Sequence, residues 1–472
     1  MKPLLLLLLL FTITRLVNLT LLPISIDEAN YLDWGWRTIH ATGHLFYPLY
    51  DAKPPGVMWL YGLSQSVISD PLLAGRLITV LFGLLCVIGL YKLSPISSIL
   101  YTLTPVFLFS DRLATMETPL AAIGVWVYYF LLRIRRFPSF TNAILLGLVL
   151  GTGLLIKTNA LLFALPLPFF ILSRSNFYRQ STLLIFVSIG FLIAASPLLL
   201  QPQFWSTLSS NSRYSLSLPE LFRFPISHWL SNFWAYLQIP FWHLTPLIFI
   251  TTLVGFRKSP KSLIFYCLLP TALVILASRS QTPRYLVPFL PLLLIPATQF
   301  LSSHRKTLYL TLISNILISC ILIFSPPSYF RLLNRLTPYS EIGHLTGDNS
   351  GYQVQADLAY LKTIQPPAII TVALNSGNPE AALINYTRSW PQFITAYLDS
   401  SMFGEAMSQF DCLASPSPLY FVARRDQQAG LSKFFRLATT IKNPYNSDFN
   451  NIYTLRSDCP AEKTLTLTLN QN

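Results

Sequence analysis

Residues 3–31 read PLLLLLLLFTITRLVNLTLLPISIDEANY, and Arg15 is the only charged residue before the acidic pair Asp27-Glu28. A helix of about 20 mostly apolar residues is long enough to cross the hydrocarbon core of a bilayer. A secretory signal peptide would also place a basic residue such as Lys2 in front of the leucines. We predict an uncleaved span, because Arg15 interrupts the leucine run and no small-residue cleavage site follows.

The same apolar character runs through most of the chain. Of its 472 residues, 52% are hydrophobic and only 11% are charged, whereas about a quarter of the residues of a soluble protein are charged. This composition excludes a soluble cytosolic enzyme and a disordered chain. It predicts an all-α polytopic membrane protein with about 11 transmembrane helices. The candidate windows lie near 3–22, 72–91, 95–110, 118–132, 141–156, 159–173, 181–199, 236–256, 262–277, 285–301 and 307–325.

The charges divide the chain into two regions. Residues 1–325 hold 22 Lys and Arg against 8 Asp and Glu, whereas residues 326–472 hold 11 of each. The basic excess therefore belongs to the apolar region, where it reports membrane orientation rather than nucleic-acid binding. We predict a transmembrane catalytic domain over 1–325 and a soluble α/β domain over 326–472.

The loops between the candidate spans differ in charge on the two sides. On one side they are basic and contain no acid: Lys92, Arg133, Arg135, Arg136, Arg174, Arg179, Arg257, Lys258, Lys261, Arg305 and Lys306. The positive-inside rule makes these loops cytoplasmic. We therefore predict a multi-pass cell-membrane protein with a cytoplasmic N-terminus and an extracytoplasmic C-terminal domain. All eight acids of the membrane region then lie outside: Asp27, Glu28, Asp33, Asp51, Asp70, Asp111, Glu117 and Glu220.

Two outer loops place acidic and basic residues close together. The first, residues 23–71, contains Asp27, Glu28 and Lys53. Acids at a helix start also complement the helix dipole, so the first pair alone does not indicate a site. The second loop contains Arg112 and Glu117. These two could form a structural ion pair, or Glu117 could face Asp27 across an outer cavity; the spacing leaves both interpretations open.

Further cations occur where the outer ends of other spans are expected. Lys157 lies between two apolar runs with almost no loop, and Arg284-Tyr285 precedes another run. A charge at such depth usually faces a cavity or a partner, although a long side chain can also extend to the headgroups. Cations beside carboxylates favour an anionic ligand such as the phosphate of a lipid.

Five short motifs, in this order and on one side of the membrane, resemble the integral-membrane GT-C glycosyltransferases. The resemblance is specifically to a bacterial, family 39-like branch that is similar to protein O-mannosyltransferases and aminoarabinose lipid A transferases. It covers roughly residues 1–325. The motifs are Asp27-Glu28-Ala-x-Tyr31, Lys53-Pro-Pro-Gly, Arg112-Leu-Ala-x-x-Glu117, Gly-x-x-x-Lys157 and Arg284-Tyr285-Leu-x-Pro288.

The resemblance implies an inverting transfer of a sugar from a polyprenyl-phosphate donor to an acceptor lipid, glycan or protein on the outer face. Asp27 would be the carboxylate that deprotonates the acceptor hydroxyl, and Glu28 would support it. Glu117 stands where relatives usually have Asp, so its catalytic role is less clearly implied. The donor phosphate would be bound by Lys53, Arg112, Lys157, Arg284 and Tyr285.

A lipid-linked donor agrees with the absence of a GxGxxG, Walker or DxD motif in the sequence. A divalent metal between Asp27 and Glu117 stays open, because hard cations prefer carboxylates. Two rival functions are a ligase or polymerase that uses lipid-diphosphate donors, and a transporter or flippase of lipid-linked sugars. A transporter should carry ionisable residues near the midplane and often repeated halves, whereas here the charges collect at one face.

The C-terminal region has the alternating pattern of a small α/β domain. A helix is expected over 353–364, and no catalytic constellation is evident. Extended segments are expected over 368–374, 393–397, 419–423 and 452–455. Cys412 and Cys459 are the only outer cysteine pair and could form a disulfide in an oxidising compartment.

Overall fold

The protein folds into two compact units in the computed structural model. The structure describes residues 2–172, 177–207, 213–347, 349–373, 377–391, 393–398, 412–415, 417–427, 434–456 and 464–466. The first, here the helical unit, comprises Met1–Leu19, Gly35–Ser64 and Gly75–Glu341. The second, here the sheet unit, comprises Thr20–Trp34, Gln65–Ala74 and Ile342–Asn472. The helix α18 (Pro326–Leu336), which follows the predicted domain boundary at 325/326, thus belongs to the helical unit. That the chain changes from a catalytic domain to a separate soluble domain at this boundary stays a proposal.

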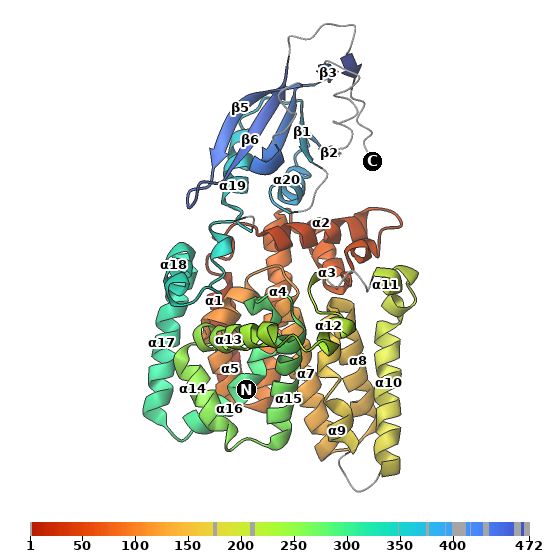
Figure 1. Ribbon diagram of the computed structural model, residues 1–472, viewed down its shortest axis with the longest axis vertical. Coiled ribbons are helices and arrows are strands. Elements are labelled where there is room, and N and C mark those ends of the chain that lie inside the picture. The colour runs from red at the N-terminus through yellow and green to blue at the C-terminus, as the bar shows by residue number, and fades with distance from the viewer. Residues whose placement is uncertain are drawn as a thin grey trace. The chain divides into compact units, whose positions relative to one another are not determined.

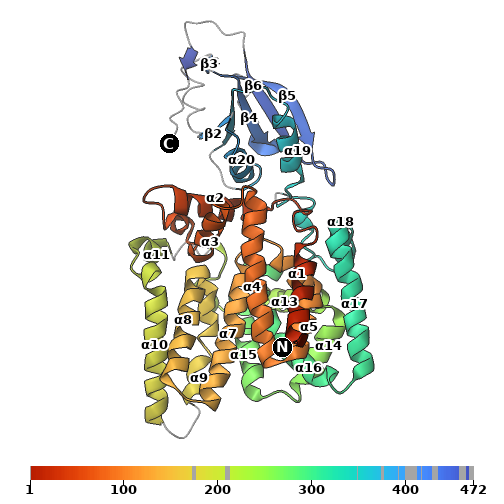
Figure 2. The same cartoon turned by 180° about the vertical axis from the view of Figure 1, so that it is seen from behind.

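The helical unit is a bundle in which the long helices α4, α7, α10 and α17 run in roughly parallel directions, with α10 and α17 at opposite edges (Figures 1 and 2). Its elements are α1 (Lys2–Leu16), η1 (Tyr47–Asp51), α3 (Gly56–Gln65), α4 (Pro71–Leu93), α5 (Pro95–Leu103), α6 (Pro105–Asp111), α7 (Glu117–Arg136), α8 (Phe140–Ile156), η2 (Thr158–Phe163), α9 (Leu167–Leu172), α10 (Phe177–Leu199), α11 (Pro202–Thr207), α12 (Leu218–Phe222), α13 (Ile226–His243), α14 (Pro246–Phe256), α15 (Lys261–Ala277), η4 (Pro283–Tyr285), α16 (Leu290–Leu301), α17 (Arg305–Phe324) and α18 (Pro326–Leu336).

Each predicted membrane window contains a helical segment, but few windows form one long helix. Among the described residues, the helices long and apolar enough to cross a membrane alone are Pro71–Leu93, Gln180–Leu199 and Arg305–Phe324. Other windows are shorter or broken at proline, as between α5 and α6 at Pro105. Proline lacks the N–H that an inner helical position donates, and its ring clashes with the preceding turn.

The window 236–256 departs from the prediction of a single span. It is split between α13 and α14, whose axes differ by 112°. Thr245 adopts a left-handed backbone with φ 73°, and Pro246 begins α14, so the helix cannot continue through this point. α13 consequently runs across the bundle rather than along it (Figure 1).

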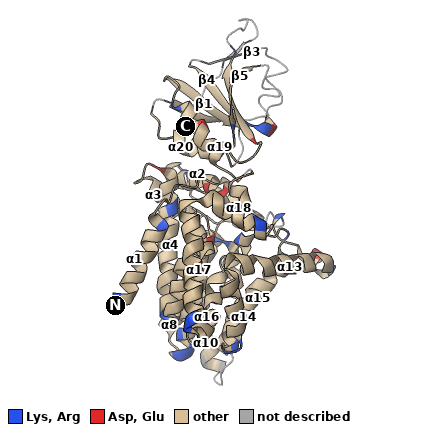
Figure 3. Cartoon of the chain, turned by 90° about the vertical axis from the view of Figure 1, so that its left-hand side faces the viewer, with Lys and Arg blue, Asp and Glu red and all other residues tan. Residues whose placement is uncertain are grey.

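Basic residues gather at one end of the helical unit. Lys92 lies in the last turn of α4, and Arg133, Arg135 and Arg136 lie in the last turn of α7, while Arg305 begins α17. Figure 3 shows this end in blue, near the labels of α8, α10 and α16. The basic residues of the predicted cytoplasmic loops therefore also gather in one place within the folded helical unit.

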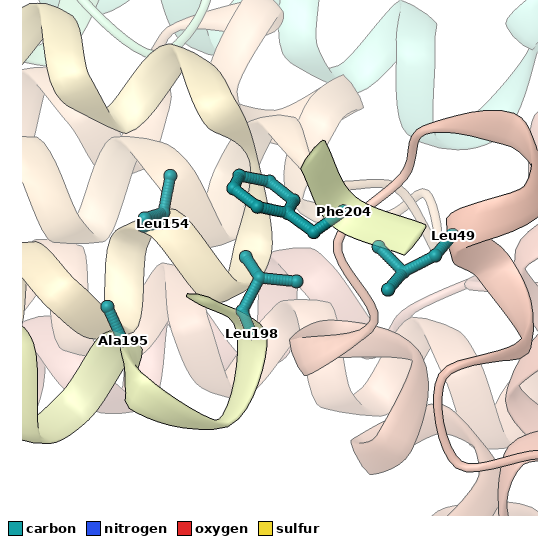
Figure 4. Close-up of a cluster of buried hydrophobic side chains, with 5 residues drawn as sticks. All are labelled: Leu49, Leu154, Ala195, Leu198 and Phe204. Atoms are coloured by element: carbon teal, nitrogen blue, oxygen red, sulfur yellow. The ribbon is translucent and has the colours of Figure 1, made fainter. Parts of the chain in front are cut away.

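A hydrophobic cluster fixes the loop that carries Lys53. Leu49 of η1 is fully buried against Leu154 of α8, Ala195 and Leu198 of α10 and Phe204 of α11 (Figure 4). Burial of a leucine side chain stabilises a fold by about 1.5–3 kcal/mol. The cluster thus holds η1, which ends two residues before Lys53, against α8 and α10.

The sheet unit contains a five-stranded mixed sheet in the order β2-β1-β4-β6-β5. β1 pairs in parallel with β2 and β4, whereas β6 pairs antiparallel with β4 and β5. Its elements are η5 (Ile342–His344), α19 (Tyr352–Leu361), β1 (Ala368–Ala373), α20 (Glu380–Thr387), β2 (Phe393–Leu398), β3 (Cys412–Ala414), β4 (Leu419–Arg424), η6 (Arg425–Gln427), β5 (Phe435–Lys442), β6 (Phe449–Leu455) and β7 (Thr464–Thr466).

The predicted α/β character of the C-terminal region is confirmed. The central strand β1 is buried at every position, as expected for an apolar strand inside a parallel part of a sheet. The expected helix and extended segments correspond to α19, β1, β2, β4 and β6. Strand β5 and helix α20 were not predicted. The suggested Cys412–Cys459 pair lies partly outside the described residues, because these do not include Cys459.

Candidate active site

Glu117 is the centre of a buried polar cluster in the helical unit. Its side chain is 3% exposed, and Oε1 lies 3.0 Å from Lys157 Nζ and 3.2 Å from Arg284 Nη2. Both cations donate to this one oxygen. The second oxygen, Oε2, is buried and has no hydrogen-bond partner among the described residues. We call Glu117, Lys157 and Arg284 the Glu117 cluster.

Three chain breaks bring this cluster together. Glu117 is the first residue of α7, Lys157 is the extended residue between α8 and η2, and Arg284 lies in the short η4. The cluster combines one carboxylate with two cations, so it keeps one net positive charge. Lys157 is 19% and Arg284 is 32% exposed at the side chain. The prediction that Lys157 meets a partner agrees with this geometry.

Arg112 does not form the ion pair with Glu117 that the sequence left open. Its Nη2 donates to the backbone oxygen of Asn18, and its Nη1 is buried without a hydrogen-bond partner among the described residues. Burial, followed by the nearby guanidinium groups of Arg76 and Arg15, lowers the pKa of Arg112 to about 10. Arg112 thus remains a cation at neutral pH, in a region that already holds other positive charges.

The ion pair between Arg15 and Asp111 was not predicted from the sequence. Both side chains are fully buried, with Arg15 Nη2 3.0 Å from Asp111 Oδ2. Tyr101 and Thr118 donate to the other carboxylate oxygen, Oδ1. Arg15 had been visible only as an interruption of a leucine run. Such a pair is tolerable inside a protein when its remaining hydrogen-bond capacity is also satisfied, so we assign it a structural role.

Lys53 and Tyr285 make other contacts in the helical unit, and Tyr285 directly follows Arg284 in η4. The Lys53 ammonium is 4.4 Å from the ring centroid of Tyr214, a cation–π contact. Nearby, Asp51 pairs with Arg213 at 2.5 Å. The Tyr285 hydroxyl lies 3.3 Å from Ser280 Oγ. Among the predicted site residues, ion pairs therefore unite Glu117 with Lys157 and Arg284.

Asp27 and Glu28 open helix α2 (Ile26–His40), whose first part belongs to the sheet unit. Glu28 is fully buried, and its Oε2 accepts from the backbone N–H and the hydroxyl of Ser25, both at 3.0 Å. This arrangement is that of a capping box, in which an acid at the third helical position accepts from the backbone N–H of the residue just before the helix. Glu28 therefore fixes the start of α2, while the neighbouring Asp27 is half-buried.

Amide side chains of the sheet unit hold the same helix start. Asn378 Nδ2 donates to the backbone oxygen of Ile24 at 3.2 Å, and Asn385 Nδ2 donates to that of Ala29 at 2.8 Å. The backbone N–H of Ile26 donates to Asn349 Oδ1 at 3.2 Å. One turn further along α2, Arg388 forms an ion pair with Asp33. The C-terminal region thus sets the backbone on both sides of Asp27.

The Glu117 cluster does not suit a divalent metal. Lys157 and Arg284 already neutralise the Glu117 carboxylate and would repel a further cation. The described residues also contain no group of three His, Cys, Asp or Glu that could hold a metal ion. We therefore derive no catalytic step through a metal.

Comparison with known proteins supports the predicted resemblance. Residues 52–200 match the family described as dolichyl-phosphate-mannose-protein mannosyltransferase. This segment includes Lys53, Arg112, Glu117 and Lys157. No curated protein sequence matches the chain.

Two crystal structures of ArnT from Cupriavidus metallidurans share the fold. The structure bound to undecaprenyl phosphate is 14% identical, with TM-score 0.61 over 96% of this chain and 98% of that one. The apo structure is 15% identical, with TM-score 0.58 over 94% and 97% of the two chains. The predicted resemblance and fold class are thus confirmed: a mostly helical, multi-pass membrane protein with a C-terminal mixed sheet.

Proposed function

We propose that this protein is a membrane glycosyltransferase that moves a sugar from a polyprenyl-phosphate donor to an acceptor hydroxyl on the outer face, with inversion. The observation that carries the proposal is the buried Glu117 cluster, which lies mostly in the segment that matches the mannosyltransferase family. Undecaprenyl phosphate bound to ArnT, which has the same fold, supports the class of donor.

Asp27 acts as the general base. Its carboxylate takes the proton of the acceptor hydroxyl as that oxygen attacks C1 of the sugar. The bond from C1 to the phosphate oxygen breaks, and polyprenyl phosphate leaves with the bonding electrons. A positioned base of this kind contributes about 10²–10⁴-fold to the rate. Glu28 is a positioning residue, because it is engaged at the start of α2.

Cations bind the donor phosphate and stabilise the charge that it gains as leaving group. Lys157 and Arg284 are the strongest candidates, because Glu117 holds both and the cluster retains a net positive charge. Arg112 contributes a buried guanidinium nitrogen that lacks a protein acceptor among the described residues. Lys53 and Tyr285 complete the proposed set. Glu117 orients the cations and keeps them charged.

The charge distribution supports the predicted membrane orientation. The basic end of the helical unit faces the cytoplasm by the positive-inside rule, so the reaction takes place at the outer end. An outer-face acceptor with a free hydroxyl could be a lipid, a glycan or a protein.

The test measures label leaving the donor. The full chain in nanodiscs is incubated with a panel of radiolabelled polyprenyl-phosphate sugars and crude envelope as acceptor source. We expect release by the wild type and a loss of at least about 100-fold in Asp27→Asn, because an amide cannot accept the proton. Asp70→Asn is the matched control: Asp70 Oδ1 accepts from Leu73 N–H at a helix start, which asparagine can also do.

Each outcome bears on a separate part of the proposal. Equal release by wild type and Asp27→Asn would refute Asp27 as the base while keeping the donor class. Release only from lipid-diphosphate donors would favour a ligase or polymerase. Absence of release from every donor, with labelled lipid moved across the bilayer instead, would favour a flippase.

A further inference from the structure

The sheet unit contains a polar pocket of about 450 Å³, which lies within the range of roughly 300–1,000 Å³ for small-molecule sites. It is distinct from the Glu117 cluster. Four segments of the sheet unit line it: the turn before α19, the start of α20, the end of β4 with η6, and the start of β6. The lining residues are Gly347, Ser350, Gln353, Val354, Asn378, Pro379, Arg424, Arg425, Asp426, Asp448 and Asn450.

Sheet topology places this pocket where a ligand site is expected. β1 and β4 are parallel neighbours at the centre of the sheet. The chain leaves β1 through α20 to reach β2 on one side, whereas it leaves β4 towards β5, which lies beyond β6 on the other side. Ligands in open α/β sheets bind outside the carboxyl ends of strands at such a switch point. Asn378 follows β1 and Arg424 ends β4, so the pocket lies at that edge.

The charges of the pocket cancel. Arg424 Nε is 3.1 Å from Glu380 Oε1 and 3.6 Å from Asp426 Oδ1, so acids already neutralise it. The other two charged lining residues, Arg425 and Asp448, also have opposite signs. A phosphate or carboxylate ligand would therefore find no net positive charge. This argues against an anionic ligand.

The lining offers hydrogen bonds in both directions. Arginine donates, aspartate accepts, and Ser350, Gln353, Asn378 and Asn450 carry hydroxyl or amide groups. Val354 and Pro379 supply the apolar contact, and no aromatic ring lines the described pocket. A sugar hydroxyl both donates and accepts a hydrogen bond, so it can use the donors and the acceptors of this lining.

We propose that the pocket between the ends of β1 and β4 binds a neutral saccharide through its hydroxyl groups. Asn378 connects the pocket to the start of α2, since it lines the pocket and donates to the backbone of Ile24. A sugar bound there would contact the same amide that fixes the backbone before Asp27. If the proposed transfer reaction is correct, a saccharide in this pocket is a part of the acceptor. Binding itself does not depend on that reaction.

The test measures binding directly. The full chain in nanodiscs is examined by saturation-transfer NMR with methyl glycosides of glucose, galactose, mannose and N-acetylglucosamine, and in parallel with glucose 1-phosphate. We expect signal from at least one neutral glycoside, and an about fivefold or greater loss in Arg425→Ala and in Asp426→Ala. Both residues are exposed, so their loss leaves the fold intact. Arg436→Ala, an equally exposed arginine on β5, should bind like the wild type.

A fourth variant distinguishes a glycoside bound in the pocket from one bound in the helical unit. Glu117→Gln should keep the glycoside signal whether or not it transfers sugar. The proposal is overturned if no glycoside binds, if Arg425→Ala and Asp426→Ala both bind like the wild type, or if only the sugar phosphate binds. A signal lost in Glu117→Gln but retained in the pocket variants would also overturn it, because the ligand would then belong to the helical unit.

Discussion

At the scale of single residues, the Glu117 carboxylate holds the side chains of Lys157 and Arg284 in place. Two cations share Oε1 of Glu117 within 3.2 Å. Each keeps further N–H donors on the same group, since an ammonium has three and a guanidinium five. Glu117 can therefore hold Lys157 and Arg284 in place without using their whole capacity to bind a phosphate.

Loss of one of these cations should weaken donor binding. We expect Arg284→Gln to raise the KM for the polyprenyl-phosphate donor about tenfold or more, because a charge-assisted bond to phosphate is lost. Steady-state kinetics over a range of donor concentrations measures this. Arg279→Gln is the matched control, since Arg279 lies in the same segment but pairs with the exposed Glu220. An unchanged donor KM in Arg284→Gln would remove this residue from the phosphate site.

A buried acid in the sheet unit should make its stability depend on pH. Asp357 is fully buried, one of its oxygens has no hydrogen-bond partner among the described residues, and Asn450 donates to the other at 2.6 Å. Burial raises the pKa of Asp357 to about 7, although the bond from Asn450 opposes this rise. The folded state thus holds a proton that the unfolded chain loses near pH 4. Stability should fall as the pH rises from about 4 to about 7 and then level off.

Asp357→Asn tests this dependence. The variant should be more stable than the wild type at pH 8, by up to about 4 kcal/mol, because no charge is then buried. The difference in stability between Asp357→Asn and the wild type should shrink towards pH 5. Amide hydrogen exchange in α19 and β6 measures the opening free energy of this unit. Asp426→Asn, whose side chain is 73% exposed, should show no such shift. A pH-independent difference for Asp357→Asn would contradict the account.

At the scale of elements, the start of α2 depends on close packing inside the sheet unit. A Cβ on Gly351 would lie 2.0 Å from the backbone oxygen of Ile24. Gly377 has φ +115°, and its Cβ would lie 2.5 Å from the Ile26 side chain. These two glycines allow the C-terminal region to approach the backbone just before Asp27.

Gly351→Ala should therefore displace the start of α2. We expect faster hydrogen exchange at the amides of Ala29 and its neighbours and an about tenfold or larger loss of transfer rate. Gly343→Ala is the control, because the nearest atom to its Cβ is 3.9 Å away. Normal exchange and normal transfer in Gly351→Ala would show that the helix that carries Asp27 does not need this contact.

The sequence predicts elements better than it predicts their partners. β1 and α17 were foreseen because a buried strand and a long apolar helix each have a clear pattern. The 112° bend between α13 and α14 was missed because apolar content alone does not reveal a break. β5 was missed because most of its side chains are exposed, which leaves little apolar signal.

The same limit applies to the candidate site. Lys157 and Glu117 could each be singled out, since a charge near an apolar run is costly unless it is paired. Their pairing, 40 residues apart, and that of Arg15 with Asp111, 96 residues apart, depend on tertiary structure. The capping role of Glu28 was visible in the spacing Ser25-x-x-Glu28 but was not recognised.

At the scale of the whole molecule, the proposed outer-face reaction requires that the basic loops face the cytoplasm. A single cysteine at Arg436 in the sheet unit should react with an impermeant maleimide in right-side-out vesicles. A single cysteine at Lys258, in the basic loop between α14 and α15, should react only after permeabilisation. Both variants are made in a background without the native cysteines. The opposite pattern would place the site on the cytoplasmic side and contradict the proposed outer-face reaction.

The anomeric configuration of the transferred sugar is the sharpest test of the proposed inverting transfer from polyprenyl phosphate. Direct attack of an acceptor hydroxyl on C1, with Asp27 as base and polyprenyl phosphate as leaving group, inverts this carbon. The product of a labelled donor of known configuration is isolated and examined by NMR. We predict a new glycosidic bond of the opposite configuration to that of the donor. A bond of the same configuration, or label released only as free sugar when acceptor is present, would contradict the account.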